Sequence, residues 1–152
     1  MVVVMKLTKE LAHFIGFWKM RSIKEGIGVV GSSEAQQQFI VEALKLKLIT
    51  PERVLLKEGV VLFHHIKYKN FFLNVVKNQN DIFARKNKLT AAYVKGMYDS
   101  EGLYEKGVLI IHKSTFQDQM LIERLGFYTQ RKKGELGIIN PRLFFEFLRK
   151  YE

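Results

Sequence analysis

The feature that most constrains this chain is an internal repeat. The segments 31–44 (GSSEAQQQFIVEAL) and 112–125 (HKSTFQDQMLIERL) align without a gap and share five identical positions. Each opens with a Ser-x-x-Gln pattern typical of a capping box, and each continues with the apolar spacing of an amphipathic helix. The identical pairs are Ser33 and Ser114, Gln36 and Gln117, Gln38 and Gln119, Glu42 and Glu123, and Leu44 and Leu125.

The elements around these two helices recur in the same order. A β-rich run precedes each helix, at 26–30 and 107–111, and strand-like sequence and an aromatic closing helix follow, at 69–76 and 142–148. Chance resemblance of two helices would not repeat their neighbours, so we predict a duplicated unit that reads helix, strands, helix, strands, helix. The predicted parts of this pseudo-twofold domain are a first repeat over 1–78, a linker over 79–88 and a second repeat over 89–152.

The charge of the chain indicates a polyanionic partner. It has 25 Lys and Arg against 15 Asp and Glu, a net charge of +10. Such a positive field attracts nucleic acid first and an anionic membrane second, although a lysine-rich surface can also serve solubility alone. The absence of cysteine excludes disulfides, thiolate metal sites and cysteine nucleophiles.

Nothing in the sequence predicts a membrane-bound protein. No apolar run reaches the roughly 18 residues that a membrane span needs. The apolar segment 1–5 is too short for the core of a signal peptide and lacks a cleavage pattern. We therefore expect a cytoplasmic protein with no membrane partner.

The first helix of the second repeat has an unusual ending. In 90–102 (TAAYVKGMYDSEG), the small residues Gly96 and Ser100 are four apart on one face, which lets two helix backbones approach closely. Asp99 and Glu101 crowd the C-terminal end, where the helix macrodipole disfavours negative charge. Acids held at an unfavourable place indicate a role such as binding a divalent metal.

The segment 94–102 (VKGMYDSEG) resembles the LAGLIDADG motif of homing endonucleases and their splicing-maturase relatives. The resemblance implies an α+β fold of two αββαββα repeats, with antiparallel sheets that form a saddle over the DNA major groove. It also implies a central pair of motif helices that pack through small residues and whose terminal acids bind Mg²⁺. On that basis Glu101 is the candidate metal ligand and catalytic residue, with Asp99 beside it.

The first repeat departs from this pattern at its acids. The segment 11–19 (LAHFIGFWK) fits the opening of the motif but contains no carboxylate. One register places Gly16 at the first acid and Trp18 at the metal-binding acid. The other aligns Ala12 and Gly16 with the two small residues of the second motif and places Phe17 at the metal-binding acid. The two registers remain alternatives, and both predict an asymmetric centre.

These observations predict a monomeric protein that binds double-stranded DNA and has impaired or lost cleavage. The alternatives are an active Mg²⁺-dependent endonuclease or nickase that uses Glu101, an RNA-binding maturase-like protein, and a protein interaction module. The predicted nucleic-acid contacts are Arg53, Lys57, Lys67, Lys69, Lys113, Arg131, Lys132 and Lys133.

The strands argue against extensive base reading. The runs 29–30 and 108–111 are apolar at consecutive positions, a pattern typical of strands that are buried on both faces. Direct contacts with bases would then depend on a few polar side chains, namely His64, His112, Tyr128 and Gln130.

Overall fold

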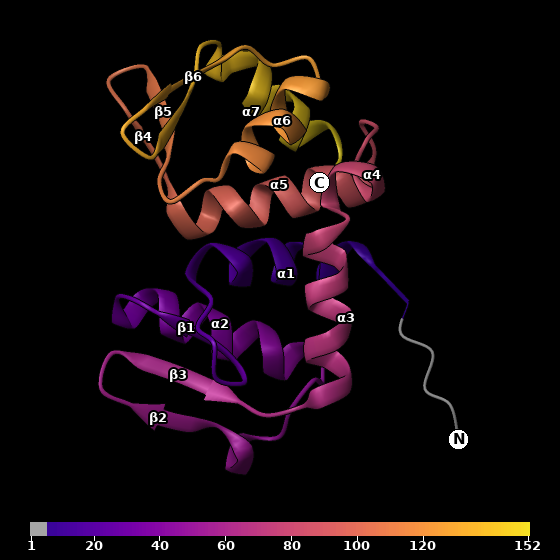
Figure 1. Cartoon of the computed structure of the whole chain (residues 1–152), viewed down its shortest axis with the longest axis vertical. Helices are drawn as coiled ribbons and strands as arrows, with labels where there is room; N and C mark the ends of the chain where they lie inside the picture. Colours follow the sequence, from indigo (N-terminus) through magenta and orange to yellow (C-terminus); the bar gives the residue numbers. More distant parts are fainter. Residues whose placement is uncertain (1–5) are drawn as a thin grey trace.

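The computed structural model describes residues 6–152, so the apolar segment 1–5 lies outside the described residues. Two long helices, α1 (Lys9–Arg21) and α5 (Lys88–Glu101), lie side by side at the centre (Figure 1). The remaining elements of each half lie on opposite sides of this pair. No helix within residues 6–152 is long and apolar enough to span a membrane.

The two halves have closely similar element orders. In the first half, an antiparallel sheet has the strand order β1-β3-β2, and in the second half the order is β4-β5-β7-β6. The first half continues from α1 with β1 (Ile27–Val30), α2 (Ser33–Lys45), a 3₁₀ turn (Pro51–Arg53), β2 (Leu55–Lys57), β3 (Val60–Phe63) and α3 (Ile66–Lys77). The second half continues from α5 with β4 (Gly102–Glu105), β5 (Val108–Ile111), α6 (Phe116–Arg124), β6 (Thr129–Lys132), β7 (Glu135–Ile138) and α7 (Pro141–Lys150). The predicted α+β class with two antiparallel sheets is confirmed.

Two glycines set the approach of the central helices. A Cβ atom added to Gly16 would lie 2.1 Å from the carbonyl oxygen of Tyr93, and one added to Gly96 would lie 2.2 Å from that of His13. Ala12 and Ser100 are also buried, with 0% and 5% of their surface exposed. Only glycine therefore fits at the crossing itself.

The crossing contacts identify equivalent positions in the two halves. Gly16 lies between Tyr93 and Met97 of α5, and Gly96 lies between His13 and Phe17 of α1. The two sets of contacts are equivalent if each residue of the first half corresponds to the residue 80 positions later in the second half (16 with 96, 13 with 93, 17 with 97). Gly16 is therefore the counterpart of Gly96, and both registers predicted for the first motif are wrong.

Among the described residues of the first half, no strand corresponds to β4. In the second half Lys106 and Gly107, with φ of 53° and 78°, form a two-residue turn between β4 and β5, as a type I′ hairpin requires. The first half is one residue shorter here, because the offset between the halves is 80 at the glycines of the crossing and 81 at the repeat of 31–44. With only Gly26 in the left-handed region before β1 (φ 59°), the chain makes a single bridge, Ser22 to Val29.

The segment predicted as a linker packs against the second half. Its start forms a short helix, α4 (Gln79–Ile82). Phe83 is fully buried, and its ring stacks on that of Tyr93 with 4.1 Å between centroids. The connection between the repeats thus adds apolar surface to the core.

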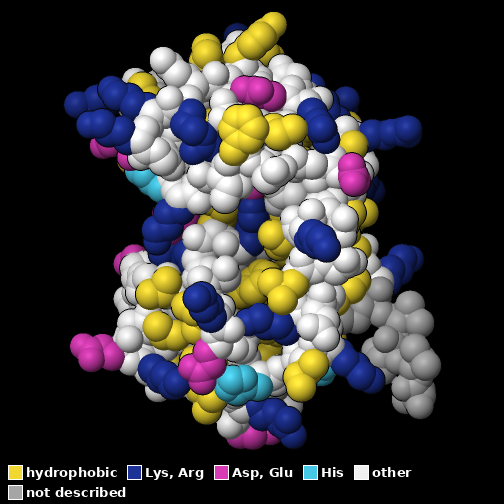
Figure 2. All heavy atoms as spheres, in the orientation of Figure 1, with side chains coloured by type: hydrophobic (Ala, Val, Ile, Leu, Met, Phe, Trp, Pro, Cys, Tyr) yellow, Lys and Arg dark blue, Asp and Glu magenta, His cyan; other side chains and the backbone are white. Residues whose placement is uncertain are grey.

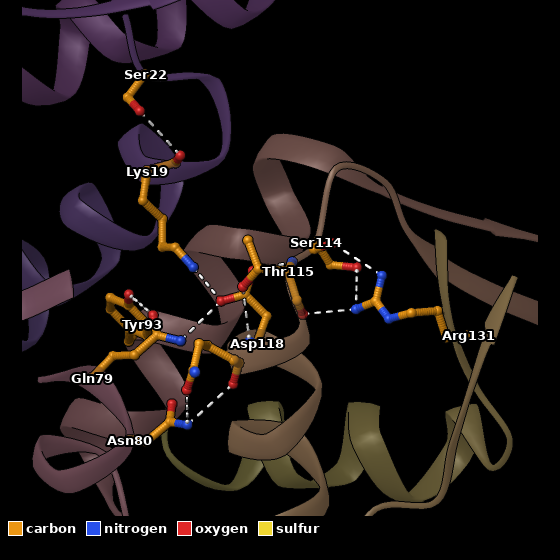
Figure 3. A network of polar contacts seen from close by, with 10 residues as sticks. Lys19, Ser22, Gln79, Asn80, Tyr93, Ser114, Thr115, Asp118 and Arg131 are labelled. Carbon is orange, nitrogen blue, oxygen red and sulfur yellow. Dashed lines mark hydrogen bonds and ion pairs between the residues drawn. The ribbon is translucent and has the colours of Figure 1, made fainter. Parts of the chain in front are cut away.

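A buried polar network joins α1 to the second half (Figure 3). The ammonium group of Lys19 pairs with Asp118 of α6, and both side chains are almost fully buried. Asp118 also accepts hydrogen bonds from the side chain of Gln79 at 2.9 Å and from the backbone N–H of Thr115 at 2.9 Å. Burial acts to raise the pKa of Asp118, but Lys19 and these donors outweigh it and hold the pKa below its usual value.

The predicted capping boxes are wrong by one residue in each copy. Ser32, not Ser33, caps α2 by accepting from the backbone N–H of Ala35 at 3.2 Å. Thr115, not Ser114, caps α6 in a reciprocal box with Asp118. Asp118 therefore contacts both the cap residue of α6 and Lys19 of α1.

The crossing predicts contrasting effects of two substitutions to alanine. Gly96→Ala forces the two backbones apart and should lower the free energy of unfolding by about 2–3 kcal/mol, despite the better helix propensity of alanine. Ser100→Ala is the matched control, because its buried Oγ has no hydrogen-bond partner within residues 6–152. The control should change stability by less than about 1 kcal/mol. Urea unfolding measures both variants, and equal effects would contradict the role of Gly96.

Candidate nucleic-acid interface

The C-terminal ends of α1 and α5 bring a carboxylate and two cations together. Glu101 is the last residue of α5, and its side chain is 10% exposed. Its Oε1 lies 3.5 Å from Nε of Arg21, the last residue of α1, and 3.3 Å from Nζ of Lys113. Arg21 also donates from Nε and Nη2 to the carbonyl oxygen of Ser100, at 3.0 and 2.7 Å. The guanidinium group therefore bridges the two halves.

The offset of 80 shows what replaces the acids of the motif in the first half. Arg21 is the counterpart of Glu101 (21 + 80), and Lys19 is the counterpart of Asp99 (19 + 80). Both acidic positions of the second motif are thus occupied by basic residues in the first half. Sequence reasoning missed Arg21 because it sought acids. The available signal was the offset of 81 in the repeat of 31–44, which is closer to the offset of 80 that aligns Gly16 with Gly96 than to the offsets of 83 and 84 of the two predicted registers.

Asp99 lies apart from Glu101, because residues two apart on a helix point to different sides. Asp99 Oδ2 lies 2.7 Å from Nε2 of His13 and 3.1 Å from Nζ of Lys95. The other ring nitrogen of His13, Nδ1, lies 2.7 Å from Oε1 of Glu42 on α2. Asp99 therefore ties α5 to α1 and α2.

The contacts in this cluster shift the pKa values of His13 and Asp99 in opposite directions. Burial alone would lower the pKa of His13, but its hydrogen bonds to Asp99 and Glu42 outweigh burial and raise the pKa to about 9. Burial acts to raise the pKa of Asp99, but the hydrogen bonds from His13 and Lys95 hold it below its usual value. At neutral pH the cluster is a charged histidine between two carboxylates.

The residues at the helix ends do not fit the shared metal centre that the resemblance implies. Glu101 already pairs with Arg21 and Lys113, and Asp99 is held by His13. Within residues 6–152, no cluster of three or more His, Asp or Glu side chains could hold a metal ion. A divalent cation bound to Glu101 would have to compete with the guanidinium group of Arg21.

Some of the predicted nucleic-acid contacts are engaged inside the protein. Lys69 donates to the backbone carbonyl oxygens of Lys24 and Gly26. Arg131 donates to Gln119 at 3.0 Å and to the carbonyl oxygen of Thr115 at 2.7 Å, so it fastens β6 to the start of α6. Lys57 pairs with Glu25 at 2.9 Å, and Lys113 pairs with Glu101.

The other predicted contacts are exposed. Their side chains make no hydrogen bond or ion pair within residues 6–152, so they are available to an anionic partner. They are Arg53, Lys67, Lys132 and Lys133.

Each sheet has one face against the helices and one outward face. The strand runs predicted to be buried on both faces are buried on one only, because Val30 and Val108 are 39% and 54% exposed. On β6 the outward positions alternate with buried-side ones and include Gln130 and Lys132. Figure 2 shows hydrophobic side chains at the surface among Lys and Arg side chains, on both halves.

The polar candidates for base contacts occupy different settings. Tyr128 is 77% exposed just before β6. His112 Nδ1 lies 3.2 Å from Glu135, and His64 Nε2 lies 3.7 Å from Glu25, so acids partner both histidines.

Comparison with solved structures shows where this fold occurs. The chain superposes on a glycine-to-serine variant of I-DmoI, a LAGLIDADG homing endonuclease, in complex with its target DNA in the presence of magnesium, with a TM-score of 0.67 and 14% identity. The match covers 93% of this chain and 94% of that one. A glutamate-to-alanine variant of I-DmoI, in complex with its target DNA in the presence of manganese, superposes with a TM-score of 0.67 and 13% identity, over 93% of this chain and 92% of that one.

These similarities confirm the predicted homing-endonuclease-like fold. At this level of identity they concern the fold alone. No protein-family profile matches the chain, and no curated protein matches its sequence.

The pKa of His13 predicts how stability depends on pH. Because the pKa is about 9 when folded, above the roughly 6.5 of a free histidine, protonated His13 contributes its full stability below about pH 6.5. That contribution, on the order of 3 kcal/mol at most, falls as the pH rises to about 9. Urea unfolding of the wild type from pH 6 to 9 should show this loss, and His13→Gln should flatten it. A His64→Gln control, at an exposed histidine, should leave the slope unchanged.

Proposed function

We propose that this chain is a DNA-binding protein that holds duplex DNA against the outward faces of its two sheets and does not cleave it efficiently. The observation that carries the first part is the likeness over 93% of the chain to a protein crystallised on its target DNA. The net charge of +10 supports the same partner.

Duplex DNA suits the surface that the two sheets present. Both motif helices end on the side where the strands lie (Figure 1), so each helix end leads into the sheet of its half on that side. Arg53, Lys132 and Lys133 are exposed beside the strands and can neutralise phosphates. The major groove of an A-form RNA duplex is deep and narrow and would not admit a sheet, which favours DNA over duplex RNA.

The weak point of an active enzyme would be its metal centre. Metal-assisted hydrolysis of a phosphodiester uses cations to activate water and to stabilise the leaving oxygen. In this chain Arg21 stands where a second acid would be and pairs with Glu101 instead. Arg21 and Lys113 both pair with Glu101, the carboxylate that Mg²⁺ would need. We therefore infer that cleavage is impaired.

One chain suffices for this function. Its two halves already supply both motif helices and both sheets, and they pack through an internal crossing at Gly16 and Gly96. We therefore propose that the protein acts as a monomer.

DNA binding should depend steeply on salt. With four exposed cations at phosphates, log Kd should rise with log salt with a slope of about 3 to 4. The double variant Lys132→Gln/Lys133→Gln should reduce that slope by about 2, measured by fluorescence anisotropy of a labelled duplex. Lys45→Gln/Lys47→Gln, two exposed lysines at the end of α2, is the matched control. Binding that is absent even at low salt would sink the proposal, and tighter binding of an RNA of the same sequence would favour the maturase-like alternative.

Cleavage should respond to the charge of residue 21. The wild type should leave supercoiled DNA intact in Mg²⁺ or Mn²⁺, because Arg21 occupies Glu101. Arg21→Glu should create a carboxylate pair that Mn²⁺ stabilises, raising the melting temperature in Mn²⁺ and producing nicked DNA. The control is Arg21→Glu combined with Glu101→Gln, which should lose both effects. Cleavage by the wild type that Glu101→Gln abolishes would overturn the inference and establish the nuclease.

A further inference from the structure

The outward face of the first sheet is apolar except for one lysine on its edge strand β2. Val30 pairs with Val60, and Val60 pairs with Lys57, in one row that crosses the sheet. The next row on the same face contains Gly28, Leu62 and Leu55.

This face is the one that points away from the helices. Its opposite face packs against the helices through Ile27, Val29, Val61 and Phe63, all at most 2% exposed, and leaves only Leu56 of the edge strand β2 exposed on that side among the paired residues. Outward, Val30 and Leu55 are 39% and 42% exposed.

The two rows contain a single hydrogen-bonding side chain, and it is already engaged. Lys57 Nζ lies 2.9 Å from Glu25. No other donor or acceptor side chain occupies these two rows, all of which lie within the described residues. Leu62 is fully buried on this face, and Ile23 reaches over neighbouring Gly28, which makes the surface still more apolar. Hydrogen bonds to base edges cannot come from the middle of this sheet.

The second sheet differs. Its outward positions include Gln130 and Lys132 on β6, with Glu135 of β7 beside Lys132, and Glu105 on β4 at the opposite edge. The other outward positions are apolar or glycine, namely Leu103, Val108, Ile110 and Gly137. Gln and Lys are side chains that hydrogen-bond to adenine and guanine in the major groove. The two halves of the molecule therefore offer different chemistry to a duplex.

We propose that the first sheet recognises its half of the DNA target by apolar contact, and that this half-site is rich in A·T pairs whose thymine methyl groups face Val30, Leu55 and Val60. The proposal rests on the proposed DNA binding. The thymine C5-methyl is the apolar group that a base pair presents in the major groove, so it is the feature an aliphatic surface can read. The exposed cations supply the attraction to phosphate that such a surface lacks.

The test replaces thymine with deoxyuridine, which removes the methyl group and leaves the hydrogen-bonding edges intact. A binding site is first selected from a random duplex library. The half under the first sheet is then located with an iron chelate tethered through Glu58→Cys in the β2–β3 turn, since the chain has no other cysteine. In that half-site, each contacting methyl removed should weaken binding about fourfold, as expected for burial of one methyl group. In the other half-site the same change should have a smaller effect.

Two variants connect this effect to the sheet. Val30→Ser/Leu55→Ser should abolish discrimination between thymine and deoxyuridine, with the fold checked by its melting temperature. Val41→Ser is the matched control, because Val41 is 40% exposed but lies on α2. Equal affinity for thymine and deoxyuridine duplexes with binding intact, or a selected half-site rich in G·C, would overturn this inference alone. Failure to bind DNA at any salt concentration would overturn the proposed function with it.

Discussion

The close crossing of α1 and α5 is the contact on which the rest of the structure depends. With glycine at both positions 16 and 96, each backbone lies against the other with no room for a Cβ atom. Because the helices cross at their middles and run in the same direction, their C-terminal ends meet, and each end leads directly into the strands of its half. The crossing thus sets three things together: the spacing of the sheets, the side on which they lie, and the residues that face one another at the helix ends.

Two C-terminal helix ends in contact concentrate partial negative charge. The first half places basic side chains, Arg21 and Lys19, near these ends. Arg21 caps the carbonyl of Ser100 and pairs with Glu101, and Lys19 pairs with buried Asp118. A pair of acids at these ends would repel unless a cation lay between them. Arg21 and Lys19 are cationic side chains of the chain itself, so no bound cation is needed. They replace that repulsion with ion pairs between the halves, to Glu101 and to Asp118. Stability and metal binding therefore compete for the same positions.

The fold could be predicted from the sequence because the same order of elements can be seen in both repeats. The strand pattern before β1, the register of the first motif and the partners of some basic side chains could not be predicted. The duplicated helices and apolar runs set the order of the elements, and Pro141 marked the start of α7. The absence of a β4 counterpart follows from one missing residue in a turn, which a segment-level pattern does not reveal. The register of the first motif depends on which glycine meets which carbonyl, and these contacts join residues that are 77 and 83 positions apart in the sequence (Gly16 with Tyr93, Gly96 with His13). Lys69 and Arg131 resemble DNA contacts in the sequence, because nothing local shows that backbone carbonyls and Gln119 take up their donors.

The geometry also separates the parts that bind from the part that would react. The outward strand faces and the exposed cations, which lie on β6 and its turn, the 3₁₀ turn before β2 and the start of α3, are separate from the crossing of the central helices. Arg21 and Glu101 lie near the pseudo-twofold axis, where one substitution alters the centre that both halves share. Since a change at the axis leaves the outer strands in place, a metal centre at the axis can be lost while the surface that we propose for DNA persists. If cleavage is lost as we propose, the outer faces can diverge from each other, because no symmetric pair of cleavage sites constrains both. The first sheet carries only Lys57 as a polar outward side chain, whereas the second carries Gln130, Lys132, Glu105 and Glu135 among apolar ones, a difference that such independence permits.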